Sequence, residues 1–234
     1  MTYWRGRTTW LTQSKGDSFV MKCLLTKRFF IRLAAVLAGL TALALVTLGS
    51  YKLILQPWMD RWGVTNAEIA AVFPGDELVP EPLQTVNRGV TIRATPEEIY
   101  PWLLQWGADQ GGLYSYDALE KLANCPITNA DRIHPEWQNR KVGDLAKLCP
   151  NEPAPPPYIV AALTPNRSMV LGHQDNGQWV EEWEFNIIPQ TDGTSRLVTR
   201  TRTTVVGGFW EVLHPITFVM ERGMLLGIKA RAEK

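Results

Sequence analysis

The chain has 234 residues, 45% of them hydrophobic and 10% aromatic, with 24 Lys and Arg against 23 Asp and Glu. This apolar content excludes a collagen-like or disordered chain, and the length predicts one or two domains. Residues 1–55 hold eight basic residues and one acid, a net charge of +7, which leaves −6 for the other 179 residues. An acidic remainder without a Lys/Arg-rich run argues against nucleic acid as a partner, because phosphate binding needs a clustered basic face.

An uninterrupted apolar segment follows the basic N-terminus. The 19 residues from Leu33 to Tyr51 carry no charge and are mostly Leu, Ala and Val, which is about the length that a helix needs to cross a bilayer. A core helix of a soluble protein is rarely apolar on every face for so long. We therefore expect a transmembrane helix over residues 33–55, after a basic tail over residues 1–32 in which Met21 is an alternative start.

The charges beside this segment predict its orientation. Five basic residues precede it, and only Lys52 and Arg61 follow it closely. The positive-inside rule therefore keeps the N-terminus cytoplasmic and places the C-terminal domain on the periplasmic or extracytoplasmic side of the cell membrane. A cleaved signal peptide starting at Met21 is the alternative. No Ala-x-Ala site ends the apolar run, which favours an uncleaved anchor.

The next segment, residues 56–84, contains four prolines and reads as a linker that can lie against the domain, with one short helix over residues 65–72 capped by Thr65. Residues 85–234 then predict a single domain. It opens with a strand over Val86 to Ala94, a helix starting at Thr95-Pro96-Glu97-Glu98 and a second short helix over Ser115 to Ala123.

An antiparallel meander and a long helix complete the predicted domain. The expected strands are Asp144 to Leu148, Tyr158 to Leu163, Ser168 to His173, Trp179 to Ile188 and Arg196 to Val206. Turn signals separate them at short intervals, which predicts antiparallel neighbours. Apolar residues at helical spacing predict a final helix from about Pro215 to Ala232, and this order of elements predicts an α+β fold whose helix buries its apolar stripe on the sheet.

Several short motifs are spread over the predicted domain and the segment before it. They are Trp62-Gly63, Pro74-Gly75-Asp76-Glu77-Leu78, Gly111 to Asp117, Asn129 to Ile133 with Pro135 to Gln138, Val142-Gly143-Asp144, Arg196-Leu197 with Arg200 and Arg202, Met220-Glu221 and Gly227-Ile228-Lys229. With these motifs the chain resembles the START-like superfamily, also called SRPBCC, and within it a bacterial, membrane-anchored branch. The resemblance covers roughly residues 62–234. It implies a helix-grip fold, in which a curved antiparallel sheet surrounds a long C-terminal helix, and a cavity between the two that takes an apolar ligand. It implies no catalytic residues.

The candidate cavity residues are aromatic, Met, Gly and two charged side chains. They are Trp102, Trp106, Tyr114, Tyr116, Glu181, Trp183, Phe185, Arg200, Met220, Met224 and Gly227. Glu181 shares a strand face with Trp183 and Phe185, so an inward Glu181 needs a partner, for which Arg200 and Arg202 are available. The pair is either a polar anchor for a ligand head group or a structural ion pair.

Other candidates also have two interpretations. Tyr114 and Tyr116 either border a cavity or pack a helix onto the sheet. Gly223 and Gly227 let either a ligand or the sheet approach the last helix closely. Asp131, Arg132, His134 and Glu136 either serve acid/base chemistry or organise their loop.

Three functions remain open from these residues. The first is a membrane-anchored domain that binds a lipid or another apolar small molecule. The second is a cyclase-like or aromatase-like enzyme that uses Glu181, Arg200, Tyr114 or His134, and the third is an assembly factor for a membrane-protein partner. Because no nucleophile, metal, phosphate-loop or dinucleotide motif is present, we favour binding over catalysis and expect neither cofactor nor metal.

Three cysteines are too few for a disulfide scaffold. An extracytoplasmic domain would oxidise its thiols. Cys125 and Cys149 are therefore candidates for one disulfide bridge.

Overall fold

The computed structural model describes residues 15–152 and 154–234, in two units that meet in the sequence between Ile54 and Leu55. Residues 1–14 of the expected tail over residues 1–32 lie outside the described residues. Helix α1 (Lys15–Ser50) begins well before the apolar segment. A π-helical turn, Tyr51–Leu55, follows it directly.

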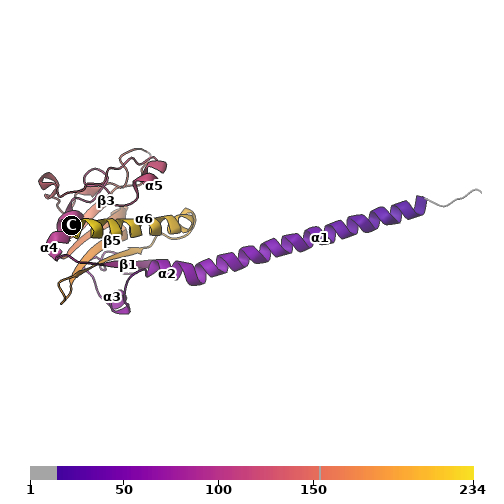
Figure 1. The fold of residues 1–234 in the computed structure, drawn as a ribbon, viewed down its shortest axis with the longest axis horizontal. Coiled ribbons are helices and arrows are strands. Elements are labelled where there is room, and N and C mark those ends of the chain that lie inside the picture. The colour runs from indigo at the N-terminus through magenta and orange to yellow at the C-terminus, as the bar shows by residue number, and fades with distance from the viewer. Residues whose placement is uncertain (1–14, 153) are drawn as a thin grey trace, which may run out of the picture. The chain divides into compact units, whose positions relative to one another are not determined.

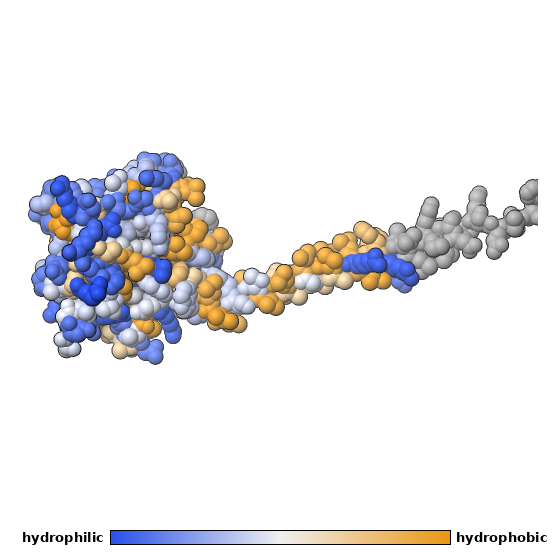
Figure 2. Space-filling model, in the orientation of Figure 1, coloured by the Kyte–Doolittle hydropathy of each residue, from blue (hydrophilic) through white to orange (hydrophobic). Residues whose placement is uncertain are grey.

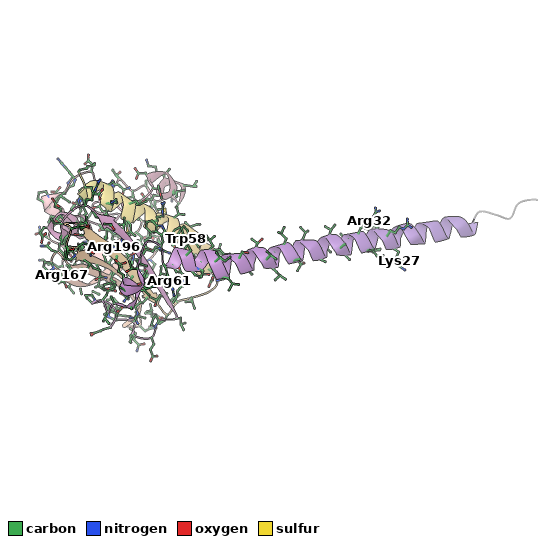
Figure 3. All side chains as sticks on the ribbon, turned by 60° about the horizontal axis from the view of Figure 1, so that its bottom comes forward. Lys27, Arg32, Trp58, Arg61, Arg167 and Arg196 are labelled. Carbon is green, nitrogen blue, oxygen red and sulfur yellow. A yellow bond between two sulfur atoms is a disulfide. The ribbon has the colours of Figure 1, made fainter. Side chains whose placement is uncertain are left out.

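One helical stretch among the described residues is long and apolar enough to cross a membrane. It runs from Lys27 to Asp60. Figure 2 shows apolar side chains along α1 after a basic group, and Figure 3 labels Lys27 and Arg32 in that group. A signal sequence near the N-terminus passes the same test of length and composition. The structure therefore shows an apolar N-terminal helix.

The second unit is built on one six-stranded antiparallel sheet (Figure 1). Its strands are β1 (Gln84–Ile92), β2 (Leu145–Ala146), β3 (Tyr158–Thr164), β4 (Ser168–Asp175), β5 (Gln178–Pro189) and β6 (Ser195–Thr203), in the order β1-β6-β5-β4-β3-β2. Short turns join β3 to β4, β4 to β5 and β5 to β6, such as Asn176-Gly177, where both residues have positive φ. The meander and the α+β class expected from the sequence are confirmed.

Short helices and one long helix surround this sheet. They are α2 (Gln56–Asp60), α3 (Asn66–Ala70), α4 (Pro96–Leu104), α5 (Asp117–Leu122), a 3-10 turn at Pro135–Trp137 and α6 (Phe209–Ala232). Helix α4 starts as expected, with a capping box between Thr95 and Glu98. Helix α6 begins at Phe209, earlier than expected, because it continues through Pro215 although Pro215 has no N–H to donate to the preceding turn.

The two faces of the sheet have different covers. Helices α4 and α6 pack on the inner face, where the core contains Trp106, Phe185, Leu197, Leu225 and Ile228. This long C-terminal helix on an antiparallel sheet is the helix-grip arrangement.

The segment expected as a linker, residues 61–83, packs against the domain. It begins beside β1, where Gly89 N donates to Trp62 O (3.0 Å) and the Trp62 ring lies 6.4 Å from Phe218 on α6. It then crosses the outer face, where Arg196 Nη2 donates to Gly63 O (2.6 Å). At its end, Leu83 N donates to Thr203 O (2.9 Å).

A disulfide joins Cys125 to Cys149, as the sequence analysis suggested. Their Cα atoms are 5.1 Å apart, well inside the range that a disulfide can span. The bond ties the chain after α5 to the chain after β2.

Candidate functional site

Four side chains on the inner face form a group that we call the inner-face cluster: Tyr158 on β3, His173 on β4, and Glu181 and Trp183 on β5. Neighbouring strands bring them together, with His173 directly opposite Glu181. The Tyr158 hydroxyl donates to Glu181 Oε1 (2.5 Å), and His173 Nδ1 lies 3.5 Å from the same oxygen. The Tyr158 and His173 rings stack with their centroids 3.9 Å apart.

The hydrogen bonds of the inner-face cluster stabilise the protonated form of His173. His173 Nε2 lies 3.0 Å from the carbonyl oxygen of Pro156, which can only accept, so this nitrogen carries a proton. Burial lowers the pKa of His173, but hydrogen bonds to Glu181 and Pro156 outweigh it and the net pKa is raised. Burial, with the charge of Glu181, raises the pKa of Tyr158, which keeps the phenol protonated as a donor.

An aromatic wall continues from the inner-face cluster into the core. The Trp183 ring lies 5.3 Å from Trp106, edge to face, and 5.0 Å from Phe185. Trp183 and the neighbouring Thr201 are only half-buried, so solvent reaches the inner face here. Among the described residues, the indole nitrogens of Trp106 and Trp183 have no hydrogen-bond partner. The arrangement offers an aromatic surface beside groups that can donate and accept hydrogen bonds.

A second polar group lies on the same face. Arg88 on β1 forms a buried ion pair with Glu221 on α6, and Thr199 donates to Glu221 (2.5 Å). Arg88 Nε also donates to Met59 O (3.0 Å), which joins α2, β1 and α6. The charge of Glu221 contributes to the raised pKa of Tyr158, so carboxylates on two elements influence the same phenol.

The structure brings together four of the candidate cavity residues, namely Trp106, Glu181, Trp183 and Phe185. The others serve different contacts. Trp102 and Met224 are buried in the core, and Met220 O accepts a hydrogen bond from Ser115 (2.9 Å).

Tyr114 and the two glycines of α6 form a close contact with no room for a ligand. Tyr114 is fully buried and its hydroxyl donates to Trp102 O (3.2 Å). A Cβ atom at Gly227 would collide with the carbonyl oxygen of Tyr114, and one at Gly223 would lie 2.5 Å from the Tyr116 ring. At these positions the structure shows the close-packing interpretation.

Arg200 and Arg202 do not pair with Glu181. In the β5–β6 register Glu181 lies opposite Thr203, while Arg202 and Arg200 lie opposite Glu182 and Glu184. Directly opposed residues share a face, so both arginines lie on the outer face. There they bind Asp76, at 2.8 Å and 2.9 Å.

Burial makes two of the outer-face carboxyl groups, those of Glu182 and Glu184, difficult to ionise. Burial and the charges of Glu184 and Asp76 raise the pKa of Glu182 to about 9. Burial also raises the pKa of Glu184 to about 7, although a hydrogen bond from Gly75 N lowers it.

His134 belongs to its loop. Its Nδ1 lies 3.1 Å from Glu136 Oε1 and its ring stacks on Trp137 at 4.2 Å. The backbone N–H of His134 donates to Gln105 Oε1 (3.0 Å). These contacts match the loop-organising interpretation.

Sequence reasoning missed Tyr158 and His173 as site residues. Both fall in expected strands, but their contact with Glu181 depends on a register that includes a bulge after His173. It also missed Asp76, Glu182 and Glu184. The available signal was the alternation in Glu182-Trp183-Glu184-Phe185, which puts two acids on the face opposite the aromatic residues.

No family model matches the sequence, and no curated protein matches it. Solved structures similar in shape include the Aha1 dimer from Colwellia psychrerythraea, with 21% identity and a TM-score of 0.39 over 64% of this chain and 97% of that one. Protein MLL2253 from Mesorhizobium loti has 15% identity and a TM-score of 0.38 over 63% and 95% of the two chains. Ara h 8.0201 has 12% identity and a TM-score of 0.38 over 64% and 97%. At this level of likeness no ligand or activity transfers to this chain.

Proposed function

We propose that this protein is a single-pass membrane protein whose helix-grip domain binds a small apolar molecule with a polar end at the inner-face cluster. The observation that carries the proposal is the half-buried Trp183 ring beside the Glu181–His173 pair. An aromatic face adjoining a few fixed polar groups is the usual composition of a small-molecule site.

Each member of the inner-face cluster has a defined part in such binding. Trp183, half-buried and packed edge to face on the buried Trp106, offers the apolar surface. Glu181 is fixed by Tyr158 and His173, so it can accept from a ligand hydroxyl or amide without losing rotamer entropy on binding.

The membrane part of the proposal is supported by the apolar helix and by the disulfide. An α-helix that exposes Leu, Ile, Val and Phe side chains along its length is stable in lipid. The basic residues before it favour a cytoplasmic N-terminus. A Cys125–Cys149 disulfide is expected in an oxidising, extracytoplasmic compartment.

Catalysis in the same place is the second candidate, and the hydrogen-bonded chain from Tyr158 through Glu181 to His173 favours it. An imidazole held by a carboxylate is a common acid/base arrangement. An enzyme would convert the molecule that it binds into a product of different mass, whereas a binding protein would release the bound molecule unchanged.

Native mass spectrometry of the full chain, extracted from membranes in a non-ionic detergent, tests the proposal. We expect a bound small molecule in the wild type, at least tenfold less in Trp183→Ala and Glu181→Gln, and no loss in Glu77→Gln, whose side chain is exposed. Wild-type protein that carries no small molecule but co-purifies with a stoichiometric membrane-protein partner would overturn the binding proposal and favour an assembly factor.

A further inference from the structure

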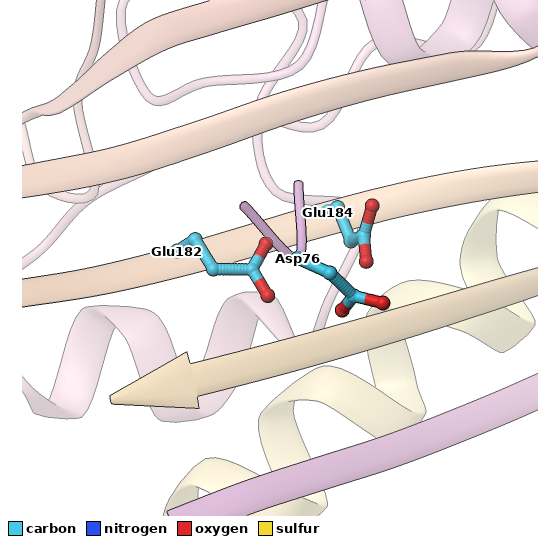
Figure 4. Close-up of side chains that lie close together, drawn as sticks. All are labelled: Asp76, Glu182 and Glu184. Atoms are coloured by element: carbon cyan, nitrogen blue, oxygen red, sulfur yellow. The ribbon is translucent and has the colours of Figure 1, made fainter. Parts of the chain in front are cut away.

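Three carboxyl groups, two of them buried and one half-buried, converge on the outer face of the sheet, away from the inner-face cluster. We call Asp76, Glu182 and Glu184 the outer-face acid cluster. One oxygen of each lies within 4.8 Å of the others. Figure 4 shows Asp76 reaching β5 between Glu182 and Glu184, with the three carboxyl groups side by side.

The hydrogen bonds of these groups are unequal. Asp76 binds Arg200 and Arg202 and accepts from Phe73 N (3.0 Å). Glu184 Oε2 accepts from Gly75 N (3.0 Å), but its Oε1 has no partner. Glu182 is fully buried and neither of its oxygens has a partner in the described part of the chain. Buried carboxyl oxygens are costly without a compensating contact, so the Glu182 carboxyl group favours a bound ligand as its partner.

The charges and the local shape point to the kind of ligand. Three carboxylates face two guanidinium groups, so one negative charge is left uncompensated when all are ionised. A Cβ atom at Gly75 would collide with Glu182 Oε2 and would lie 3.1 Å from Glu184 Oε2. Only glycine at this position lets both carboxyl groups reach the same point.

We infer that the outer-face acid cluster binds a divalent cation of the size of Ca²⁺, with Glu182 and Glu184 as its main ligands and Asp76 shared between the cation and the arginines. All the candidate ligands are oxygen atoms, which hard cations prefer. Ca²⁺ lies about 2.3–2.6 Å from its ligands, so two oxygens of one shell are at most about 5.2 Å apart, which the 4.8 Å limit satisfies. Mg²⁺ demands near-ideal octahedral geometry, usually keeps several of its waters and is rarely held by a buried set of protein carboxylates alone, so the all-carboxylate cluster favours Ca²⁺.

This cation has a structural consequence for the fold. Glu182 and Glu184 belong to β5, while Asp76 belongs to the segment that crosses the outer face. A shared cation joins the two, in addition to the arginine contacts. The bound ion therefore holds residues 73–76 on the sheet.

The test measures metal content and melting temperature of the full chain in a non-ionic detergent. After EDTA treatment and return of Ca²⁺, we expect about one Ca²⁺ per chain by elemental analysis and a melting temperature several degrees above the EDTA form. Glu182→Gln, which keeps the shape of the side chain, should lose both effects, and the exposed neighbour Glu77→Gln should keep both.

Two results would overturn the inference. A wild type that binds no Ca²⁺ and melts at the same temperature with Ca²⁺ and with EDTA would show that the glutamates are neutralised by protons. Stabilisation by Mg²⁺ without any by Ca²⁺ would contradict the assigned size. Neither result bears on small-molecule binding at the inner face, because the two groups lie on opposite faces of β5.

Discussion

Arg200 shows how one residue can hold a whole segment on the sheet. Its guanidinium lies over the Phe73 ring at 4.5 Å. It donates hydrogen bonds to Asn87 Oδ1, to both Asp76 carboxylate oxygens and to the carbonyls of Glu68, Ile69 and Ala71. These carbonyls end α3, so Arg200 also caps that helix.

Arg200→Lys should therefore destabilise the domain strongly. An ammonium group keeps the charge but cannot reproduce the planar set of donors, and each hydrogen bond to a charged group that is lost costs about 1.5–3 kcal/mol. Chemical denaturation measures the loss. The same change at the exposed Arg167 should leave stability within about 0.5 kcal/mol, and equal stability of the two variants would show that the Arg200 contacts are weak.

His173 should make stability depend on pH. Because its folded pKa is raised above the usual value of 6.5, its stabilising effect is complete below that value and is lost as the pH rises through the folded pKa. The difference in unfolding free energy between wild type and His173→Gln should be larger at about pH 5.5 than at about pH 8.5.

His134→Gln is the control for this prediction, because His134 pairs with a Glu136 side chain that is 64% exposed and well screened. A His173 difference that grows with pH would contradict the assigned ion pair with Glu181.

At the scale of elements, helix α6 is held against the rest of the domain both by close packing at glycine and by side-chain contacts. Gly227 lies against the backbone of Tyr114, which has a positive φ of 57°, and Arg231 lies 5.0 Å above the Tyr114 ring. Arg231 Nε also donates to Ala130 O (2.7 Å). The loops on either side of α5 are thus joined to α6.

Gly227→Leu should lower the melting temperature, because a larger side chain meets a carbonyl oxygen that cannot move without its loop. Overpacking costs about 1–3 kcal/mol, which outweighs the gain in helix propensity of up to about 1 kcal/mol. A thermal melt measures the change. Ala230→Leu, at an exposed position of the same helix, is the control, and an unchanged melt for Gly227→Leu would indicate open space under α6.

Removing the Cys125–Cys149 bridge should loosen the region between α5 and β2. The cysteines are 24 residues apart, for which the chain-entropy model gives about 3 kcal/mol of stabilisation. We expect the double Ser variant to unfold at lower denaturant concentration than the wild type. Alkylation of unreduced protein should find neither thiol free, and two labelled cysteines at these positions would show that the bridge does not form.

The elements were predictable to a greater extent than the contacts between them. Alternating residues and turn dipeptides indicate β5 and β6 directly, but a strand pattern does not state which residue faces which partner. The prediction that Arg200 or Arg202 pairs with Glu181 is therefore wrong, since a shift of one residue in register exchanges the faces of the sheet. Pro215 predicts a helix start, because proline has no N–H to donate to the preceding turn. Tertiary packing outweighs this local preference, and α6 begins at Phe209.

On the scale of the whole molecule, the folded domain begins immediately after the apolar helix. The second unit starts at Leu55. Within it Met59 is buried, Trp58 contacts Phe218 at 5.3 Å, and Asp60 lies 2.6 Å from His214. The residues of α2 are thus part of the domain.

Expression of residues 55–234 should consequently give a soluble, folded domain, whereas residues 84–234 should not fold stably. The shorter chain loses α2 and the entire cover of the outer face, which leaves Glu182, Glu184 and Arg200 without the groups that bury them. Size-exclusion chromatography and a cooperative melt distinguish the two. Stable folding of residues 84–234 would show that the cover is dispensable.

The second unit follows the first directly in the sequence, between Ile54 and Leu55. If α1 is anchored as proposed, the domain is tethered to the bilayer without intervening linker residues. It then searches the layer of water next to the membrane rather than the volume of the whole compartment. Its encounters would then be governed by diffusion in two dimensions and by concentrations at the membrane, so a water-soluble supply of its ligand would matter less than the amount dissolved in lipid.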